Sequence, residues 1–409
     1  MGDFIVMKRL GIFALSVFLI FFFASCDSGQ HPSGYEHADV ALMATDAEPP
    51  QELTRQPLPQ NRRMPGSLVS LQELVNYSFY IWENGAFELP ITGATGWTAI
   101  DLPLHTAPSQ SSDIITMLAA GQPFTILQES DDWWLVEMAD MSGWVTSKLC
   151  MINLPDILPS IVYNITNAAH SLFRSSGRYI PNVTGRTLYR ARDFNERLGR
   201  EEYIAPVLYG MARKIGLAQQ AALADGNTLV MYEAFRPSAS HYIVYNNLHA
   251  LVSSDRVVHA GMATPPWNTR WFLAAAPYNH QRGTAIDVSL AQINHYQIRV
   301  TGDYAFIHIS GHSMHQMQTP MHELSIAAVV FRYPVHSRSL TAWREGIFAD
   351  NATPATILMH RYLTDSGLVP LASEWWHFND LVHTELAVEH NITGEFFTER
   401  TFSRPPVRN

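Results

Sequence analysis

The chain has 409 residues, with 27 lysines and arginines against 37 aspartates and glutamates, a formal net charge of −10, and 47% hydrophobic residues. This composition excludes a disordered chain, and it excludes nucleic-acid binding through a general basic surface. Two cysteines cannot form a disulfide-rich scaffold or a zinc site of four thiolates, whereas 18 histidines leave metal ligation by imidazole open. The length predicts two or three domains.

A short apolar segment lies near the amino terminus. Lys8 and Arg9 precede an apolar run over residues 10–24, which is shorter than the roughly 20 residues of a membrane-spanning helix but suits a secretory signal. Small residues lead directly into Cys26 and a polar stretch follows, as in bacterial lipoprotein signals; an ordinary signal peptide is the alternative. We expect a lipoprotein signal peptide at 1–25 and an exported protein, anchored by lipid to a bacterial membrane and facing the periplasm or the cell exterior.

Two further regions precede the largest part of the chain. Residues 26–66 are rich in proline and small polar residues, which predicts a flexible tether. Residues 67–150 contain short strand-like runs, at 97–100, 124–127, 134–136 and 143–145, separated by turn residues. Four segments follow one another in the order Ala107-Pro108-Ser109, Leu118-Ala119-Ala120-Gly121, Trp133-Trp134 and Gly143-Trp144-Val145. On these segments the region resembles a bacterial SH3-like domain. In such domains aromatic residues could bind peptidoglycan, although we expect Trp134 and Trp144 to fill the core of a small barrel.

A larger mixed region of helices and strands follows. Apolar residues at helical spacing predict a helix over 203–224, which ends before Gly226. A strand is expected over 228–232, and a second helix over 354–364. A stretch that contains several histidines is expected to be a solvated loop, with a second metal site as the alternative. Its histidines are His308, His312, His315 and His322.

The first chemically informative segment is YNHQRGTAIDVSL, residues 278–290. Alternation of apolar residues predicts a strand in which Asp287 faces away from Ile286 and Val288. His280 lies just before this strand, and an imidazole that converges with a carboxylate suits zinc. Taken alone, these two residues are weak evidence for a metal site, and a surface pair is the default interpretation.

Two further segments supply chemistry. In SEWWHF, Glu374 and His377 converge only if the chain forms a helical turn or a bulge. His377 could then be a third metal ligand while Glu374 takes a proton from an attacking water; an aromatic-rich core strand is the alternative. Arg236, at the end of a strand and before a proline, could stabilise an oxyanion, or it could simply pair with Glu233.

Together these segments resemble the D-alanyl-D-alanine dipeptidases (VanX type) of the zinc D,D-peptidase family, because FRP, YNHQRGTAID and EWWHF occur in the family's order. The resemblance covers about residues 152 to 400. It implies an α+β, hedgehog/VanX-like domain at 151–409, with helices packed on a mainly antiparallel sheet, after the small all-β barrel. It also implies the following roles: one Zn²⁺ bound by His280, Asp287 and His377, Glu374 as general base and then proton donor to the leaving amine, and Arg236 as transition-state stabiliser.

The chain departs from the family pattern at two expected substrate contacts. Tyr278 stands where the family usually has a serine near the substrate carboxylate. His322 stands where an acid usually pairs with the free amine of the dipeptide, and Glu323 would replace that acid after a shift of one residue. These departures leave the metal ligands and the base unchanged.

The resemblance implies zinc-dependent hydrolysis of D-alanyl-D-alanine in cell-wall peptide metabolism. One alternative is a D,D-carboxypeptidase that releases terminal D-alanine from longer muramyl peptides. Another is a wall-binding lipoprotein without catalysis, because a fold alone does not establish activity. The expected partners are D-Ala-D-Ala or wall peptides that end in it, peptidoglycan through the SH3-like domain, and a membrane through the lipid anchor, with no nucleic acid.

Overall fold

The computed structural model describes residues 86–272, 275 and 278–407. The predicted signal peptide, Cys26, the tether and the beginning of the predicted SH3-like domain therefore lie outside the described residues. Among the helices of the described ranges, we find none that is both long and apolar enough to cross a membrane.

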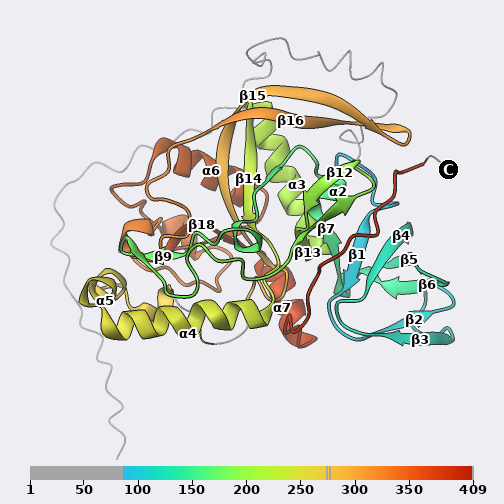
Figure 1. Ribbon diagram of the computed structural model, residues 1–409, viewed down its shortest axis with the longest axis horizontal. Helices are drawn as coiled ribbons and strands as arrows, with labels where there is room; N and C mark the ends of the chain where they lie inside the picture. Colours follow the sequence, from blue (N-terminus) through green and yellow to red (C-terminus); the bar gives the residue numbers. More distant parts are fainter. Residues whose placement is uncertain (1–85, 273–274, 276–277, 408–409) are drawn as a thin grey trace, which may run out of the picture. The chain divides into compact units, whose positions relative to one another are not determined.

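Short antiparallel strands form the first sheet (Figure 1). The runs predicted around residues 97, 125, 135 and 144 correspond to β1, β4, β5 and β6, whereas β2 and β3 were not predicted. Trp134 is fully buried, as expected. Trp144 is only half-buried, contrary to the prediction, because its neighbours Gly143 and Val145 take the inward positions of strand β6. The strands are β1 (Thr95–Thr98), β2 (Leu102–His105), β3 (Ile114–Leu118), β4 (Pro123–Ser130), β5 (Trp133–Met138) and β6 (Met141–Thr146).

The first sheet continues into the larger part of the chain. Strand β7 (Cys150–Asn153) pairs with β1, and β13 (Pro206–Leu208) pairs with β7. The Tyr209 ring packs edge-on against Trp134, with 4.6 Å between ring centroids, and its hydroxyl donates to Glu129 at 2.5 Å. The helix predicted over 203–224 begins only at Tyr209, because the residues before it are recruited into this sheet.

The second sheet carries the chemically informative segments. Its strand order is β17-β18-β15-β14-β8, and β16 pairs with β15. Only the β14–β8 pair is parallel, so the described fold is α+β with mainly antiparallel sheets. The strands are β8 (Val162–Tyr163), β14 (Asn227–Glu233), β15 (Ala285–Thr301), β16 (Tyr304–Met314), β17 (Val369–Leu371) and β18 (Glu374–Asn379).

Strands β15 and β16 form a long two-stranded ribbon (Figure 1, orange). The ribbon corrects the expectation of a solvated histidine loop, because His308 and His312 are residues of β16. His308 accepts a hydrogen bond from Arg200 at 2.6 Å, and His315 contacts the Asn227 side chain at 2.8 Å. The stretch forms a strand although it is polar, because pairing with β15 and these contacts with distant segments stabilise it.

Helices pack around the second sheet, and α3 contacts both α6 and β14. Helix α6 begins where predicted, because the Thr353 side chain caps it by accepting from the Thr356 amide at 3.2 Å. Helices α4, α5 and α7 were not predicted. The helices are α2 (Leu154–Ile157), α3 (Tyr209–Ala224), α4 (Ser238–Ser254), α5 (Arg256–Ala263), α6 (Pro354–Asp365) and α7 (Leu381–Glu389). Four short strands complete these elements: β9 (Arg174–Ser175), β10 (Arg178–Tyr179), β11 (Arg192–Asn195) and β12 (Arg200–Tyr203).

Candidate active site

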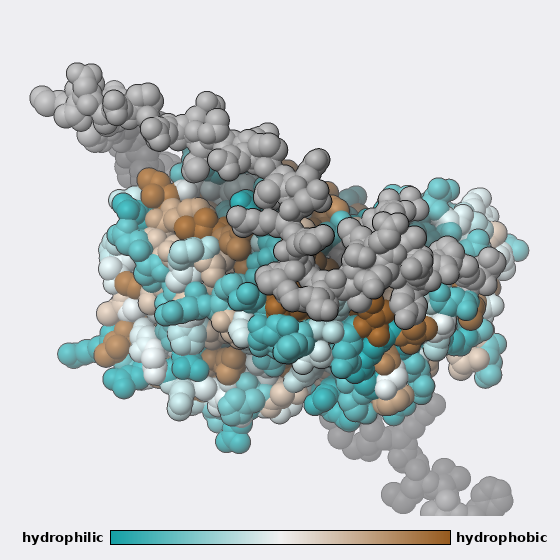
Figure 2. Space-filling view, turned by 90° about the horizontal axis from the view of Figure 1, so that it is seen from above, coloured by the Kyte–Doolittle hydropathy of each residue, from teal (hydrophilic) through white to brown (hydrophobic). Residues whose placement is uncertain are grey.

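An open cleft of about 810 Å³ lies where the second sheet meets helices α4 and α7. Figure 2 shows the molecule from above, and hydrophilic and apolar residues are intermixed over the part of this face that can be seen. The cleft is the candidate site, because six residues that the sequence indicated line it: Arg236, Tyr278, His280, Asp287, Glu374 and His377.

Three neighbouring strands place acidic and imidazole side chains side by side. Asp287 of β15 lies opposite Glu233 of β14 on one side and opposite His377 of β18 on the other. Residues directly opposite each other on adjacent strands carry their side chains on the same face, about 5 Å apart. The pairing register therefore brings the carboxylate and the imidazole together although they are 90 residues apart in the sequence.

His280 reaches the same point from the turn before β15. Gly283 ends this turn with a φ of +68° and donates its amide to the His280 carbonyl at 3.2 Å. A Cβ atom at residue 283 would lie 3.0 Å from the Leu208 amide nitrogen. Glycine is required here both for the left-handed backbone and for the close approach to β13.

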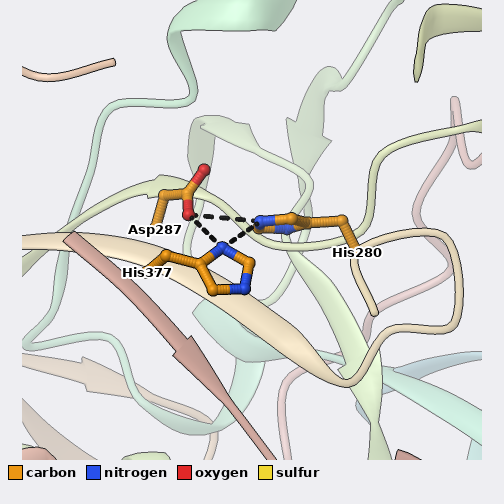
Figure 3. Close-up of side chains that lie close together, drawn as sticks. All are labelled: His280, Asp287 and His377. Atoms are coloured by element: carbon orange, nitrogen blue, oxygen red, sulfur yellow. Dashed lines mark hydrogen bonds and ion pairs between the residues drawn. The ribbon is translucent and has the colours of Figure 1, made fainter. Parts of the chain in front are cut away.

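His280, Asp287 and His377 form a compact group (Figure 3). His280 Nε2 lies 3.2 Å from Asp287 Oδ1 and 3.1 Å from His377 Nδ1, and His377 Nδ1 lies 3.0 Å from Asp287 Oδ1. Ligand atoms around a tetrahedral zinc ion with bonds of about 2.0–2.1 Å are separated by roughly 3.3 Å. The three atoms therefore have the mutual spacing of metal ligands.

The outer hydrogen bonds of both histidines direct lone pairs into the group. His280 Nδ1 contacts the Ala234 carbonyl oxygen at 2.8 Å, and His377 Nε2 contacts Asn379 Oδ1 at 2.9 Å. Because these oxygens accept, each imidazole donates outward, so that once it is neutral, as a metal ligand must be, its inward nitrogen carries a lone pair. Two lone pairs and a carboxylate oxygen that face one another favour a bound cation, so the residues fit a divalent metal ion.

The charges within this buried group act on one another. Burial lowers the pKa of His280. Burial also opposes ionisation of Asp287, but the adjacent His280 and hydrogen bonds from the histidines hold the pKa of Asp287 well below its usual value. For His377, burial is outweighed by the hydrogen bond and charge of Asp287, which raise its pKa. Asp287 is therefore the anionic centre of the site.

Glu374 lies at the edge of the group, with Oε2 3.9 Å from His377 Nδ1. The pairing of β17 with β18 shifts register, so that Pro370 lies opposite Phe378 but Leu371 lies opposite Glu374. This irregularity is the bulge that allows residues three apart in a strand to share a face. Burial raises the pKa of Glu374 to about 7, a value suited to proton transfer near neutral pH.

Arg236 enters the cleft between two carboxylates. Its guanidinium lies 3.0 Å from Glu233 Oε2 and 4.0 Å from Asp287 Oδ2, and it packs over the Phe173 ring. Arg236 thus pairs with Glu233, which was the alternative to a role in the site, but it also lines the cleft. The arginine can therefore be held by Glu233 while it faces a ligand.

A second group of possible metal ligands shares Asp287. Glu233, Asp287 and His322 have ligand atoms within 4.8 Å of one another. The Arg236 guanidinium contacts both carboxylates of this group, and His322 already contacts Asp287 at 3.1 Å. A resident cationic side chain thus compensates the negative charge of this second group.

The candidate substrate contacts are placed differently from one another. Tyr278 is 41% exposed and lines the cleft. His322 and Glu323 are buried, and neither is among the residues that line it. Asn379, which orients His377, was missed by sequence reasoning; its position two residues after His377 in the same strand, and therefore on the same face, was the available signal.

Comparison with known proteins gives two similarities. The Bacterial SH3 domain family model matches residues 100–149. This range begins just before β2 and ends with the short 3-10 helix η2 (Ser147–Leu149). The D-alanyl-D-alanine dipeptidase of Escherichia coli (strain K12) is 22% identical over 198 residues, which cover 48% of this chain and 72% of that protein.

Proposed function

We propose that this protein is a zinc-dependent peptidase that hydrolyses the peptide bond of D-alanyl-D-alanine in cell-wall peptide metabolism, on the zinc D,D-peptidase fold. The observation that carries the proposal is the convergence of His280, Asp287 and His377 within 3.2 Å of one another in a cleft that also contains Glu374 and Arg236. The similarity to a protein named for this reaction supports the choice of substrate.

The three facing atoms, His280 Nε2, Asp287 Oδ1 and His377 Nδ1, would hold the ion. Bound zinc would polarise the substrate carbonyl and lower the pKa of water. Glu374 would take a proton from the attacking water at a carboxylate oxygen and later return it to the leaving amine. Arg236, anchored by Glu233, would bind the oxygen on which negative charge develops.

A second candidate function, D,D-carboxypeptidase action on longer wall peptides, is favoured by the cleft. Its volume of about 810 Å³ lies in the upper part of the range of roughly 300–1,000 Å³ for sites that bury drug-sized ligands, and two alanine residues would fill little of it. Charged side chains of both signs line it beyond the metal group: Arg270, Arg282, Arg338, Glu385 and Glu389.

We also propose that the protein is exported and lipid-anchored through Cys26, and that the SH3-like region at 67–150 contacts peptidoglycan. The match to a bacterial SH3 domain supports a role at the wall. An anchored enzyme near intact wall would meet long peptides more often than free dipeptides, which agrees with the second candidate.

The deciding experiment measures D-alanine release by the zinc-loaded protein from free D-Ala-D-Ala and, separately, from a muramyl pentapeptide. Turnover of the dipeptide establishes a dipeptidase, and turnover of the pentapeptide alone establishes a carboxypeptidase. If neither substrate is cleaved while zinc is bound, the proposed hydrolysis is wrong and the non-catalytic alternative gains support.

A further inference from the structure

His322 touches the candidate metal-binding aspartate from a side that the candidate histidine ligands leave open. Its Nε2 lies 3.1 Å from Asp287 Oδ2, whereas His280 and His377 approach Oδ1. A carboxylate oxygen only accepts hydrogen bonds, so His322 donates through Nε2–H. The two oxygens of Asp287 therefore have different partners.

The backbone of His322 adopts a conformation that side chains rarely take. Its φ is +61°, in the left-handed region, where histidine is more common than most residues but still pays a cost. The Arg174 amide donates to the His322 carbonyl at 3.1 Å, and the Leu324 amide donates to the Arg174 carbonyl at 2.8 Å. These two bonds hold the chain at the His322 carbonyl and at Leu324, and so help to maintain the left-handed backbone and the direction of the His322 side chain.

Aromatic rings fix the imidazole itself. The Phe173 ring stacks on it with centroids 4.3 Å apart and an interplanar angle of 17°, and Trp376 meets it edge-on at 5.9 Å. His322 is fully buried, and its Nδ1 has no hydrogen-bond partner among the described residues. The hydrogen bond to Asp287 is therefore the one polar contact that the His322 ring makes among the described residues.

We infer that His322 is a positioning residue that occupies Asp287 Oδ2 and so presents Oδ1 alone to the metal ion. A single carboxylate oxygen and two imidazoles make three ligand atoms, which leaves a coordination position free for chemistry. Arg236 is 4.0 Å from the same Oδ2 and is engaged by Glu233 at 3.0 Å, so it does not substitute for this bond. The inference rests on the proposed function only for the presence of the metal.

Two variants separate the hydrogen bond from the shape of the residue. In His322→Gln the amide nitrogen can replace Nε2 as donor, whereas His322→Leu has no donor, and both pay the cost of the left-handed backbone. The zinc dissociation constant is measured by competition with a chromogenic chelator, and the visible spectrum of the Co²⁺-loaded protein reports the coordination number. We expect His322→Leu to weaken zinc binding about 10–100-fold and to change the Co²⁺ spectrum, while His322→Gln stays close to the parent protein.

His360→Leu is the matched control. His360 is also buried among aromatic rings, including Phe331 and Phe348, and its Nε2 also has no hydrogen-bond partner among the described residues. This variant removes a buried imidazole without altering Asp287, so zinc affinity should not change. The inference is overturned if His322→Leu keeps the parent's zinc affinity and Co²⁺ spectrum, or if His322→Gln loses as much affinity as His322→Leu.

If His322→Leu does not fold, the ring proton decides the question. Nitrogen-15 spectra of the histidine rings in the zinc-loaded parent protein, with His322→Gln used for assignment, should show the His322 proton on Nε2; a proton on Nδ1 would overturn the inference. Failure of the proposed function can be told apart from failure of this inference. If zinc affinity depends on His322 but neither D-Ala-D-Ala nor the muramyl pentapeptide is cleaved, only the proposed function is refuted. A parent protein that binds no zinc refutes the inference.

Discussion

Replacement of Glu374 by glutamine tests the proposed chemistry most directly. The Glu374 side chain is only 12% exposed, and glutamine has nearly the same size, so packing is preserved while the basic oxygen is lost. A positioned general base typically contributes about 10²–10⁴ in rate, or roughly 3–5 kcal/mol of transition-state stabilisation. Because burial raises the pKa of Glu374 to about 7, the carboxylate is matched to neutral pH, and we expect a loss of about 10³ in kcat with little change in KM.

The same residue predicts the sign of the pH dependence. The ionised carboxylate is the form that accepts a proton, so kcat/KM should rise with pH below the pKa of Glu374 and level off above it. A bound cation favours the ionised form, which places the midpoint of this rise at or below about 7 in the zinc-loaded protein. Glu374→Gln should lack this rise.

The assay follows D-alanine release between about pH 5 and 8.5, with zinc content measured on each sample. Glu201→Gln is the control, because Glu201 is an exposed acid of β12 that is not among the residues lining the cleft; it should stay within about threefold of the parent. Glu374→Gln with full zinc and more than about a tenth of the parent activity would show that Glu374 is not the base.

Three further predictions concern other parts of the chain. Arg282 lines the cleft, and its buried Nε has no hydrogen-bond partner among the described residues, so we expect it to bind the carboxylate of a peptide substrate. Arg282→Gln should raise KM about tenfold for a peptide that ends in a free carboxylate but not for the same peptide with an amide end. Equal effects on both peptides would refute a role in carboxylate binding. Burial raises the pKa of Glu88 to about 8 from an ordinary 4.5. Its contribution to the free energy of unfolding is therefore complete below about pH 4.5 and falls as pH rises towards 8, by up to about 1.4 kcal/mol per pH unit. The free energy of unfolding of Glu88→Gln, measured with denaturant, should depend less steeply on pH, and an unchanged dependence would contradict this. Cys26→Ser should move the protein from the membrane fraction to the soluble fraction, and continued membrane association would argue against a lipid anchor.

Local patterns sufficed for many individual elements of the described residues. Strand β14 and helix α6 lie within a residue or two of their predicted bounds, because apolar periodicity and a threonine cap are local features. Helix α3 begins six residues later than predicted, since β13 is formed only by pairing with β7. The ribbon β15–β16 was missed for the same reason: its stability lies in pairing between strands and in contacts such as that of Arg200 with His308.

For the candidate site too, the sequence identified the residues but not all of their contacts. His280, Asp287, Glu374, His377 and Arg236 were chosen from residue type and motif, and the structure brings all five to one cleft, while their chemical roles stay predictions. The sequence also indicated that His322 is unusual. It could not show that this ring faces Asp287 rather than a substrate, because that depends on a left-handed backbone and on the Phe173 ring.

The sequence by itself therefore determined which chemical groups are available, since a motif specifies residue types and their spacing along the chain. Only the tertiary structure decided which atoms of those groups face one another. Register between β14, β15 and β18 sets Asp287 beside His377, and the turn at Gly283 brings His280 to the same point. Distances of about 3 Å between residues far apart in sequence arise from strand pairing and packing, which no local pattern specifies.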